Sequence, residues 1–313
     1  MELSEEILKG NKVALAKGIT LLESSLESDS ISAQNLISKC SEYSGNSMRI
    51  GITGVPGVGK STFIETFGKF LTQKGHKVAV LAIDPTSEKT HGSILGDKSR
   101  MHQLSVDENA FIRPSPSSGT LGGVASKTKD SIVLCEAAGF DVILIETVGV
   151  GQSETTVNNI CDFFLLLMLA GAGDELQGIK RGIMELADLL VISKADGDNI
   201  QKSENAKLEY QRALHLFPEM ENGWTPKVSV CSSLENIGIN KIWETITTHN
   251  SQMKSSAWKI ENRKRQNIFW LHYTIKEELG NKKYNSLISE GKLENLEKEL
   301  SAGKTIHQII EEL

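Results

Sequence analysis

The sequence lacks several features that would place the protein in other functional classes. Its 313 residues carry a net charge of −6, so there is no general basic field to attract nucleic acid or anionic lipid. The four cysteines (Cys40, Cys135, Cys161 and Cys231) are scattered without a Cys-x-x-Cys pair, and three of them lie in apolar surroundings. We therefore expect small buried side chains rather than a metal site or disulfides, and no nucleic acid partner.

A targeting signal and a membrane span are also missing. The first residues, Met1 to Glu6, lack the positive start and the apolar core of a signal peptide. The longest apolar run, Phe163 to Ala170, is far too short to cross a bilayer. We expect no membrane association and a reducing, cytoplasmic location, although a cleaved organellar presequence could have preceded Met1.

Three segments of different character follow one another along the chain. Residues 1–45 carry apolar residues at helical spacing and indicate a helical N-terminal arm. Residues 46–250 alternate short β-rich runs with helical patterns, and residues 251–313 indicate a helical C-terminal arm. The β-rich runs are 49–53, 78–83, 142–145, 163–169, 189–192 and 228–230. Their continuous apolar character predicts strands buried on both faces, and hence an α/β fold with a mostly parallel central sheet flanked by helices.

The most specific motif joins the first of these strands to the following helix. Residues 54–61 fit the pattern G-x-x-x-x-G-K-S, in which glycines let backbone N–H groups converge on phosphate oxygens. Lys60 would supply positive charge to the outer phosphates, the hydroxyl of Ser61 would ligate Mg²⁺, and the helix would add its positive dipole end. We predict a P-loop nucleotide site made of Gly54, Val55, Pro56, Gly57, Val58, Gly59, Lys60, Ser61 and Thr62.

Two later strands end in acids that suit a metal bound to the nucleotide. Strand 78–83 runs into Asp84, and strand 142–145 runs into Glu146. Ligands of open α/β sheets lie beyond the carboxyl ends of the strands, so both acids should point toward the phosphate loop and join Ser61 as ligands or water contacts of Mg²⁺. Three residues beyond Glu146, the amide of Gly149 is placed to sense the γ-phosphate. Val150 stands where small GTPases have a glutamine that orients water, so unassisted hydrolysis should be slow.

A third strand end indicates which base is bound. Strand 189–192 runs into Ser193-Lys194-Ala-Asp196, which resembles the Asn-Lys-x-Asp guanine motif with serine in the place of asparagine. Asp196 would accept hydrogen bonds from the guanine N1–H and 2-amino group, and Lys194 would lay its aliphatic stem along the base. The run Cys231-Ser232-Ser233, just past the last strand, matches the loop that backs the base edge. Because Asp196 is intact, we predict that guanine selectivity survives.

These motifs, in this order, resemble the ArgK/MeaB family of P-loop GTPases, which includes the mitochondrial MMAA-type proteins. The resemblance covers nearly the whole chain from the phosphate loop onward. Three further runs are close to sequences of this family, namely 111–123, 145–154 and 173–182. The resemblance implies Mg²⁺-dependent GTP hydrolysis and a chaperone role for an adenosylcobalamin-dependent acyl-CoA mutase, chiefly methylmalonyl-CoA mutase, by gating cofactor loading and protecting the mutase.

The resemblance also implies roles for particular segments. Residues 174–180 would respond to the partner, with Gln177 and Lys180 nearest the nucleotide, and Lys180 is the candidate for stabilising charge in the transition state. The C-terminal arm would form a homodimer. We expect one long helix from Ser255 to Leu279 whose apolar stripe (Ile268, Leu271, Ile275 and Leu279) has surface left to bury, with Arg263, Lys264 and Arg265 on a solvated or partner-facing side.

Three other functional classes stay open at this point. One is a non-catalytic binding module, suggested by Val150, in which GTP only orders the switch segments. A protein kinase or transport ATPase would need ATP, which the guanine motif disfavours. A metallochaperone GTPase would need a cluster of cysteine and histidine side chains at metal-ligand spacing, and the sequence has none.

Overall fold

The computed structural model describes residues 2–24, 26–83, 101–114, 121–147, 153–171 and 181–313. Its centre is one sheet of seven parallel strands in the order β3-β2-β4-β1-β5-β6-β7. The strands are β1 Met48–Gly54, β2 Val78–Ile83, β3 Ala110–Arg113, β4 Val142–Thr147, β5 Phe163–Leu169, β6 Leu189–Ser193 and β7 Lys227–Val230. The predicted α/β fold with a parallel sheet is confirmed.

Six of the seven strands were predicted, and the additional one lies at an edge of the sheet. Strand β3 has four residues, of which Ala110 and Phe111 are buried while Ile112 and Arg113 are only half-buried. So short a strand with one half-buried end carries little of the continuous apolar character that marks the inner strands. Within the described part of the chain it pairs with β2 alone, which makes it an edge strand there.

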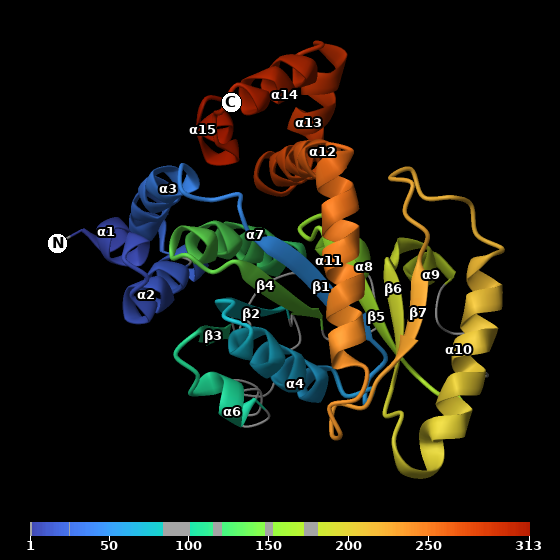
Figure 1. The fold of residues 1–313 in the computed structure, drawn as a ribbon. Coiled ribbons are helices and arrows are strands. Elements are labelled where there is room, and N and C mark those ends of the chain that lie inside the picture. Colours follow the sequence, from blue (N-terminus) through green and yellow to red (C-terminus); the bar gives the residue numbers. More distant parts are fainter. Residues whose placement is uncertain (1, 25, 84–100, 115–120, 148–152, 172–180) are drawn as a thin grey trace.

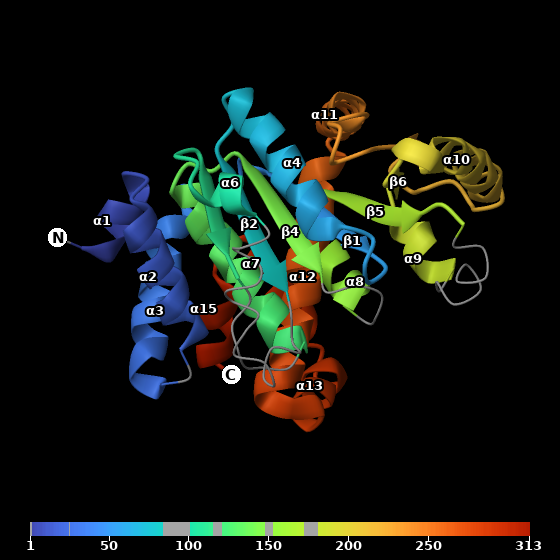
Figure 2. The ribbon, with the colours of Figure 1, turned by 90° about the horizontal axis from the view of Figure 1, so that it is seen from below.

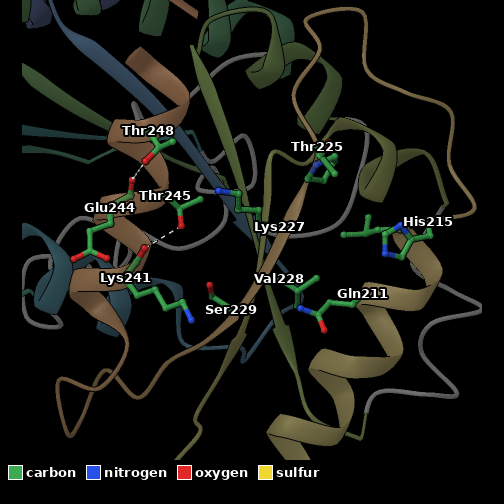
Figure 3. Close-up of a pocket in the computed structure, with 12 residues that line it drawn as sticks. Gln211, His215, Thr225, Lys227, Val228, Ser229, Lys241, Glu244, Thr245 and Thr248 are labelled. Atoms are coloured by element: carbon green, nitrogen blue, oxygen red, sulfur yellow. Dashed lines mark hydrogen bonds between the residues drawn. The ribbon is translucent and has the colours of Figure 1, made fainter. Parts of the chain in front are cut away.

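Helices cover both faces of the sheet, as the two views show (Figures 1 and 2). On one face lie α4 (Lys60–Gln73) and α11 (Ile239–Ser255). On the other face lie α7 (Leu121–Ala137), α8 (Ser153–Asn158), α9 (Arg181–Leu186) and α10 (Ile200–Leu214), since Val228 of β7 points toward α10 while Lys227 and Ser229 point toward α11 (Figure 3). The short helix α6 (His102–Ser105) packs beside α4, where the side chain of Leu104 fills the space over Gly68. The four cysteines are buried free thiols.

The N-terminal segment packs against the sheet domain. Its helices α1 (Leu3–Leu8), α2 (Lys12–Glu23) and α3 (Glu27–Ser41) lie against α7. Their apolar positions, Ile7, Leu15, Ile19, Leu36 and Ile37, belong to the main hydrophobic core. An ion pair between Glu23 and Arg113 ties α2 to β3.

The C-terminal segment contains the helix that the sequence predicted from Ser255 to Leu279, although this helix begins slightly later, at Trp258. Helix α11 ends at Ser255, and Ala257 adopts a left-handed conformation with φ of 59° before α12 (Trp258–Thr274) begins. A π-helical turn, Ile275–Leu279, ends this second helix. The predicted domain boundary at residue 250 falls inside α11, whose residues Ile242 and Ile246 are fully buried in the core. The remaining helices are α13 (Gly280–Ser289), α14 (Leu293–Ser301) and α15 (Ile306–Glu311).

Two expectations about the surface of α12 were wrong. Leu271 and Ile275, the middle of the predicted free stripe, are fully buried within the chain, where the indole of Trp270 donates to the carbonyl of Asn159 (2.8 Å). Arg263 is not solvated but forms a two-pronged ion pair with Asp162 (2.7 and 2.8 Å). Arg265, by contrast, is half-exposed and pairs with Glu221. No helix within the described residues is long and apolar enough to span a membrane.

Candidate functional site

The phosphate loop leaves the carboxyl end of β1 and enters α4, at the edge of the sheet where the guanine motif also lies. Gly54 has φ of 156°, and a side-chain carbon there would lie 2.5 Å from the carbonyl oxygen of Leu167. This position accepts only glycine because the neighbouring strand β5 comes so close. Gly59, with φ of 98°, stands at the start of α4 and provides no side-chain cap. The N-terminus of this 14-residue helix is therefore available for an anion.

Lys60 lies across the mouth of this loop. Its ammonium donates to the carbonyl of Gly54 (2.8 Å) and lies 3.4 Å from that of Val55. Burial lowers the pKa of Lys60, while the nearby carboxylates of Glu146 and Glu154 act in the opposite direction. Neutral carbonyls replace only part of the hydration that the ammonium has lost, so phosphate oxygens would be better partners.

The predicted metal ligands Ser61 and Glu146 lie together. The hydroxyl of Ser61 donates to a carboxylate oxygen of Glu146 (3.1 Å), and Glu146 is 9% exposed at the end of β4. Next to it, the hydroxyl of Thr147 donates to that of Thr53 (2.8 Å), which links the ends of β4 and β1. A hydroxyl and a carboxylate at this separation are the hard oxygen donors that Mg²⁺ takes, so these residues fit the ion.

The guanine motif holds the phosphate loop from the side of β6. Ser193 is 4% exposed, and its hydroxyl lies 2.8 Å from the carbonyl oxygen of Val58 and 3.1 Å from that of Met168. The ammonium of Lys194 donates to the carbonyl of Gly57 (2.8 Å). Ser193 thus faces the loop rather than an open base pocket, whereas the exposed Lys194 lies beside Gly59.

The loop after β7 supports Asp196. The hydroxyl of Ser232 donates to the carboxylate of Asp196 (2.5 Å), and the backbone N–H of Ala195 donates to the carbonyl of Cys231 (3.0 Å). Burial raises the pKa of the Cys231 thiol to about 12, so this side chain stays neutral. The carbonyl of Ser233 accepts from the hydroxyl of Thr66 on α4 (2.9 Å). The three residues predicted at the base edge therefore adjoin Asp196 and the phosphate-loop helix.

Four predicted site residues, Asp84, Gly149, Gln177 and Lys180, lie outside the described residues. Val55 and Val58 are buried in the core, and the two residues between them, Pro56 and Gly57, are exposed. Sequence reasoning missed Thr66, because nothing in a helical sequence tells which loop a hydroxyl will reach. It also gave no separate role to Glu154, a carboxylate that is 1% exposed and acts on Lys60.

A hollow lies beside β7 (Figure 3). It has a volume of about 640 Å³ and lies between α10, β7 and α11. Polar side chains such as Gln211, Lys227 and Thr245 line it, and none of the predicted nucleotide residues does. The ammonium of Lys227 lies 4.8 Å from the ring centre of Trp224, which accounts for part of its placement. This hollow is therefore separate from the predicted nucleotide site.

Known proteins resemble this chain over most of its length. A putative GTPase of Caulobacter vibrioides is 50% identical over 277 residues, which cover 88% of this chain and 85% of that protein. The GTPase ArgK of Escherichia coli is 46% identical over 280 residues, covering 90% and 85%. The mitochondrial methylmalonic aciduria type A homolog of Mus musculus is 47% identical over 281 residues, covering 87% and 68%.

A solved structure and a family model agree with these relatives. The crystal structure titled LAO/AO transport system kinase superposes with a TM-score of 0.77 at 39% identity, covering 89% of this chain and 84% of that one. Residues 15–287 match the model of the family described as methylmalonyl-CoA mutase-associated GTPase MeaB. The match includes the phosphate loop, Glu146 and the guanine motif, and the chain belongs to the MeaB family of P-loop GTPases.

Proposed function

We propose that this protein binds and hydrolyses GTP with Mg²⁺ and acts as a chaperone of an adenosylcobalamin-dependent acyl-CoA mutase. The observation that carries the nucleotide part is one cluster at the carboxyl edge of the sheet. There Lys60 lies over the open N-terminus of α4, and Ser61 is 3.1 Å from Glu146. This arrangement suits a phosphate chain with a divalent cation and suits few other ligands.

The hydrogen bond that orients Asp196 supports guanine selectivity. Its carboxylate accepts from Ser232 and keeps further lone pairs for the two guanine donors that adenine does not offer in these positions. Competition binding against a fluorescent GDP analogue should rank GTP and GDP well ahead of ATP. An ATP affinity similar to that of GTP would contradict the guanine assignment.

Ser61 and Glu146 would hold Mg²⁺ together with oxygens of the bound nucleotide, and the sequence adds Asp84 to this set. The ion would neutralise phosphate charge during hydrolysis. Chelation of divalent cations by EDTA should abolish hydrolysis, and readdition of Mg²⁺ should restore it. Hydrolysis that continues undiminished in EDTA would contradict this part of the proposal.

Hydrolysis should be slow until a partner binds. Val150 can neither donate nor accept a hydrogen bond to orient water, so a positive group would have to act in the transition state. Lys180 is our candidate, with Gln177 beside it in the partner-responsive segment. In single-turnover assays, Lys180→Ala should lose the acceleration produced by the client mutase. If this variant is accelerated as strongly as the unmodified protein, the positive group lies elsewhere.

The client assignment rests on family membership. The family is described as methylmalonyl-CoA mutase-associated, and the mouse relative is named for methylmalonic aciduria. We propose an adenosylcobalamin-dependent acyl-CoA mutase of the same cell, reached in the cytoplasm, as the partner. Mixing the purified mutase with this protein should give a complex on size exclusion whose amount depends on the bound nucleotide. No complex in any nucleotide state would contradict the chaperone role.

We also propose a homodimer formed by the C-terminal helices of residues 251–313. Leu271 and Ile275 of the predicted stripe are buried within the chain, so the support comes instead from Ile260, Phe269 and Ile288, which are 64%, 37% and 52% exposed. Ile260→Glu combined with Phe269→Glu should turn a dimer into a monomer in light scattering at micromolar concentration. Ile31→Glu in α3, where the side chain is 67% exposed, is the matched control and should leave the dimer intact.

A further inference from the structure

Ser193, the last residue of β6, is a buried hydroxyl between two carbonyl groups. Its oxygen lies 2.8 Å from the carbonyl oxygen of Val58 in the phosphate loop and 3.1 Å from that of Met168 in β5. A serine hydroxyl has one proton, so it can donate fully to only one of these oxygens at a time. The shorter distance favours Val58.

The contact with Val58 decides where the next backbone amide points. The carbonyl of Val58 and the N–H of Gly59 belong to one planar trans peptide unit, in which the two groups point in opposite directions. A carbonyl held toward β6 therefore turns the N–H of Gly59 to the opposite side, where the phosphate loop receives its ligand. Lys194 holds the preceding carbonyl, that of Gly57, in the same way (2.8 Å).

The buried position gives this hydrogen bond its importance. Val58 is fully buried and Ser193 is 4% exposed, so water cannot replace the hydroxyl as a donor at little cost. Asp196, three residues later, is only half-buried and is oriented by Ser232 instead. The two ends of the guanine motif are thus attached to different parts of the site.

We propose that Ser193 is a positioning residue of the phosphate loop and takes no part in reading the base. This inference rests on the proposed nucleotide binding. It adds that the serine affects how tightly the loop binds the phosphates, and does so equally for every nucleotide. An asparagine amide has two N–H donors and can donate to both carbonyls. Serine in this place should therefore give weaker binding of the phosphates than asparagine would.

The test compares Ser193→Ala and Ser193→Asn in the full-length chain. Dissociation constants are measured for GDP, for inosine diphosphate, which lacks the 2-amino group, and for ADP. The alanine variant should bind all three about fivefold to tenfold more weakly with unchanged ratios between them. The asparagine variant should bind them at least as tightly as the unmodified protein. Ser203→Ala in α10 removes another fully buried hydroxyl, one without a hydrogen-bond partner among the described residues, and should change nothing.

A second readout separates positioning from a general loss of stability. At saturating GDP, the ³¹P chemical shift of the β-phosphate should move in Ser193→Ala and stay in place in Ser203→Ala, because only the first alters the amide beside the phosphate. Unchanged affinities in Ser193→Ala would overturn the inference, and so would a changed ratio between the dissociation constants for GDP and inosine diphosphate. A protein that binds ATP as well as GTP would refute the proposed guanine selectivity but not this inference, since binding of the phosphates is measured with any nucleotide that binds.

Discussion

Buried charges at the amino ends of the parallel strands (the amino edge of the sheet) and at their carboxyl ends (the carboxyl edge) have different partners. At the amino edge, Asp162 directly precedes β5 and is paired with Arg263, which holds the pKa of this carboxyl down at about 2 against the effect of burial. Glu136 is paired with Arg49 through two hydrogen bonds of 3.0 Å. At the carboxyl edge, Lys60 donates to the neutral carbonyl of Gly54. Charges that stabilise the fold are paired by direct hydrogen bonds within the chain, whereas the ammonium of Lys60 donates to neutral carbonyls, with the carboxylates of Glu146 and Glu154 only nearby.

The acids of the amino edge also follow a repeated backbone pattern. Asp141, Asp162 and Asp188 each directly precede a strand, and each accepts from a backbone N–H within or just before a neighbouring strand, at 2.7, 3.0 and 2.8 Å. Such bonds satisfy donors at the beginning of the sheet that would otherwise lack partners. At this edge, acids therefore complete the hydrogen bonding of the sheet, and substitutions there should affect stability more than activity.

The largest expected effect breaks the pairing at the amino edge. Arg263→Ala leaves the buried carboxylate of Asp162 without its guanidinium partner; the backbone N–H of Arg49 (3.0 Å) and the ammonium of Lys259 (3.5 Å) remain. Loss of one member of a buried ion pair costs about 3–5 kcal/mol of unfolding free energy, measurable by urea denaturation. Arg265→Ala, which removes an exposed pair with Glu221, is the control and should cost far less. Equal losses in the two variants would refute the distinction.

A slightly smaller effect is expected for the carboxyl edge, and it should fall on activity alone. Lys60→Ala removes the cation that faces the phosphates and should slow single-turnover GTP hydrolysis by about 10²–10³-fold. Stability should stay equal or rise, because burial lowers the pKa of Lys60 and its charge is costly to bury. Lys74→Ala, at the exposed end of the same helix, should leave hydrolysis unchanged. A loss of stability comparable to that of Arg263→Ala would contradict the comparison.

Asp196→Ala sharpens the comparison within the carboxyl edge. The variant loses the acceptor for two guanine donors, so the preference for GTP over ATP should shrink by roughly 10–100-fold. Asp198→Ala, exposed two residues further along, provides the control. An Asp196→Ala protein that keeps the full preference would mean that another group reads the base.

The smallest expected effect concerns the attachment of α15 to α7. His307 lies 3.2 Å from the buried carboxylate of Asp130, and this hydrogen bond raises the pKa of His307 above its usual 6.5. Lys129 opposes the shift, and Glu278 supports it. Because the folded-state pKa is the higher one, the stabilisation is complete below pH 6.5 and is lost as the pH rises through the raised value.

The matching measurement is thermal unfolding between pH 5.5 and 8.5. The melting temperature of His307→Gln should fall below that of the unmodified protein at pH 5.5, by an amount equivalent to less than about 1 kcal/mol, and the gap should close at pH 8.5. Taking the difference between the two proteins removes the other titrating groups, including Asp188, whose pKa burial raises to about 7. A difference in melting temperature that stays constant with pH would mean that the ion pair between His307 and Asp130 does not contribute to stability.

The sequence determined by itself those features that depend on contiguous residues. The phosphate loop, Glu146 and the guanine motif follow apolar strands directly, and parallel strands bring their carboxyl ends to one edge whatever the details of packing. Apolar runs alone likewise predicted six of the seven strands. Local signals of this kind need no knowledge of which segments meet.

Only the tertiary structure decided the features that join distant residues. Ser193 donates to a carbonyl 135 positions away, and Arg263 reaches Asp162 across 101 positions. The sequence suggested a base contact for the first and a solvated position for the second. A side chain shows its charge or its hydroxyl in the sequence, but whether that group finds a partner depends on packing between segments that helical and strand periodicity do not relate.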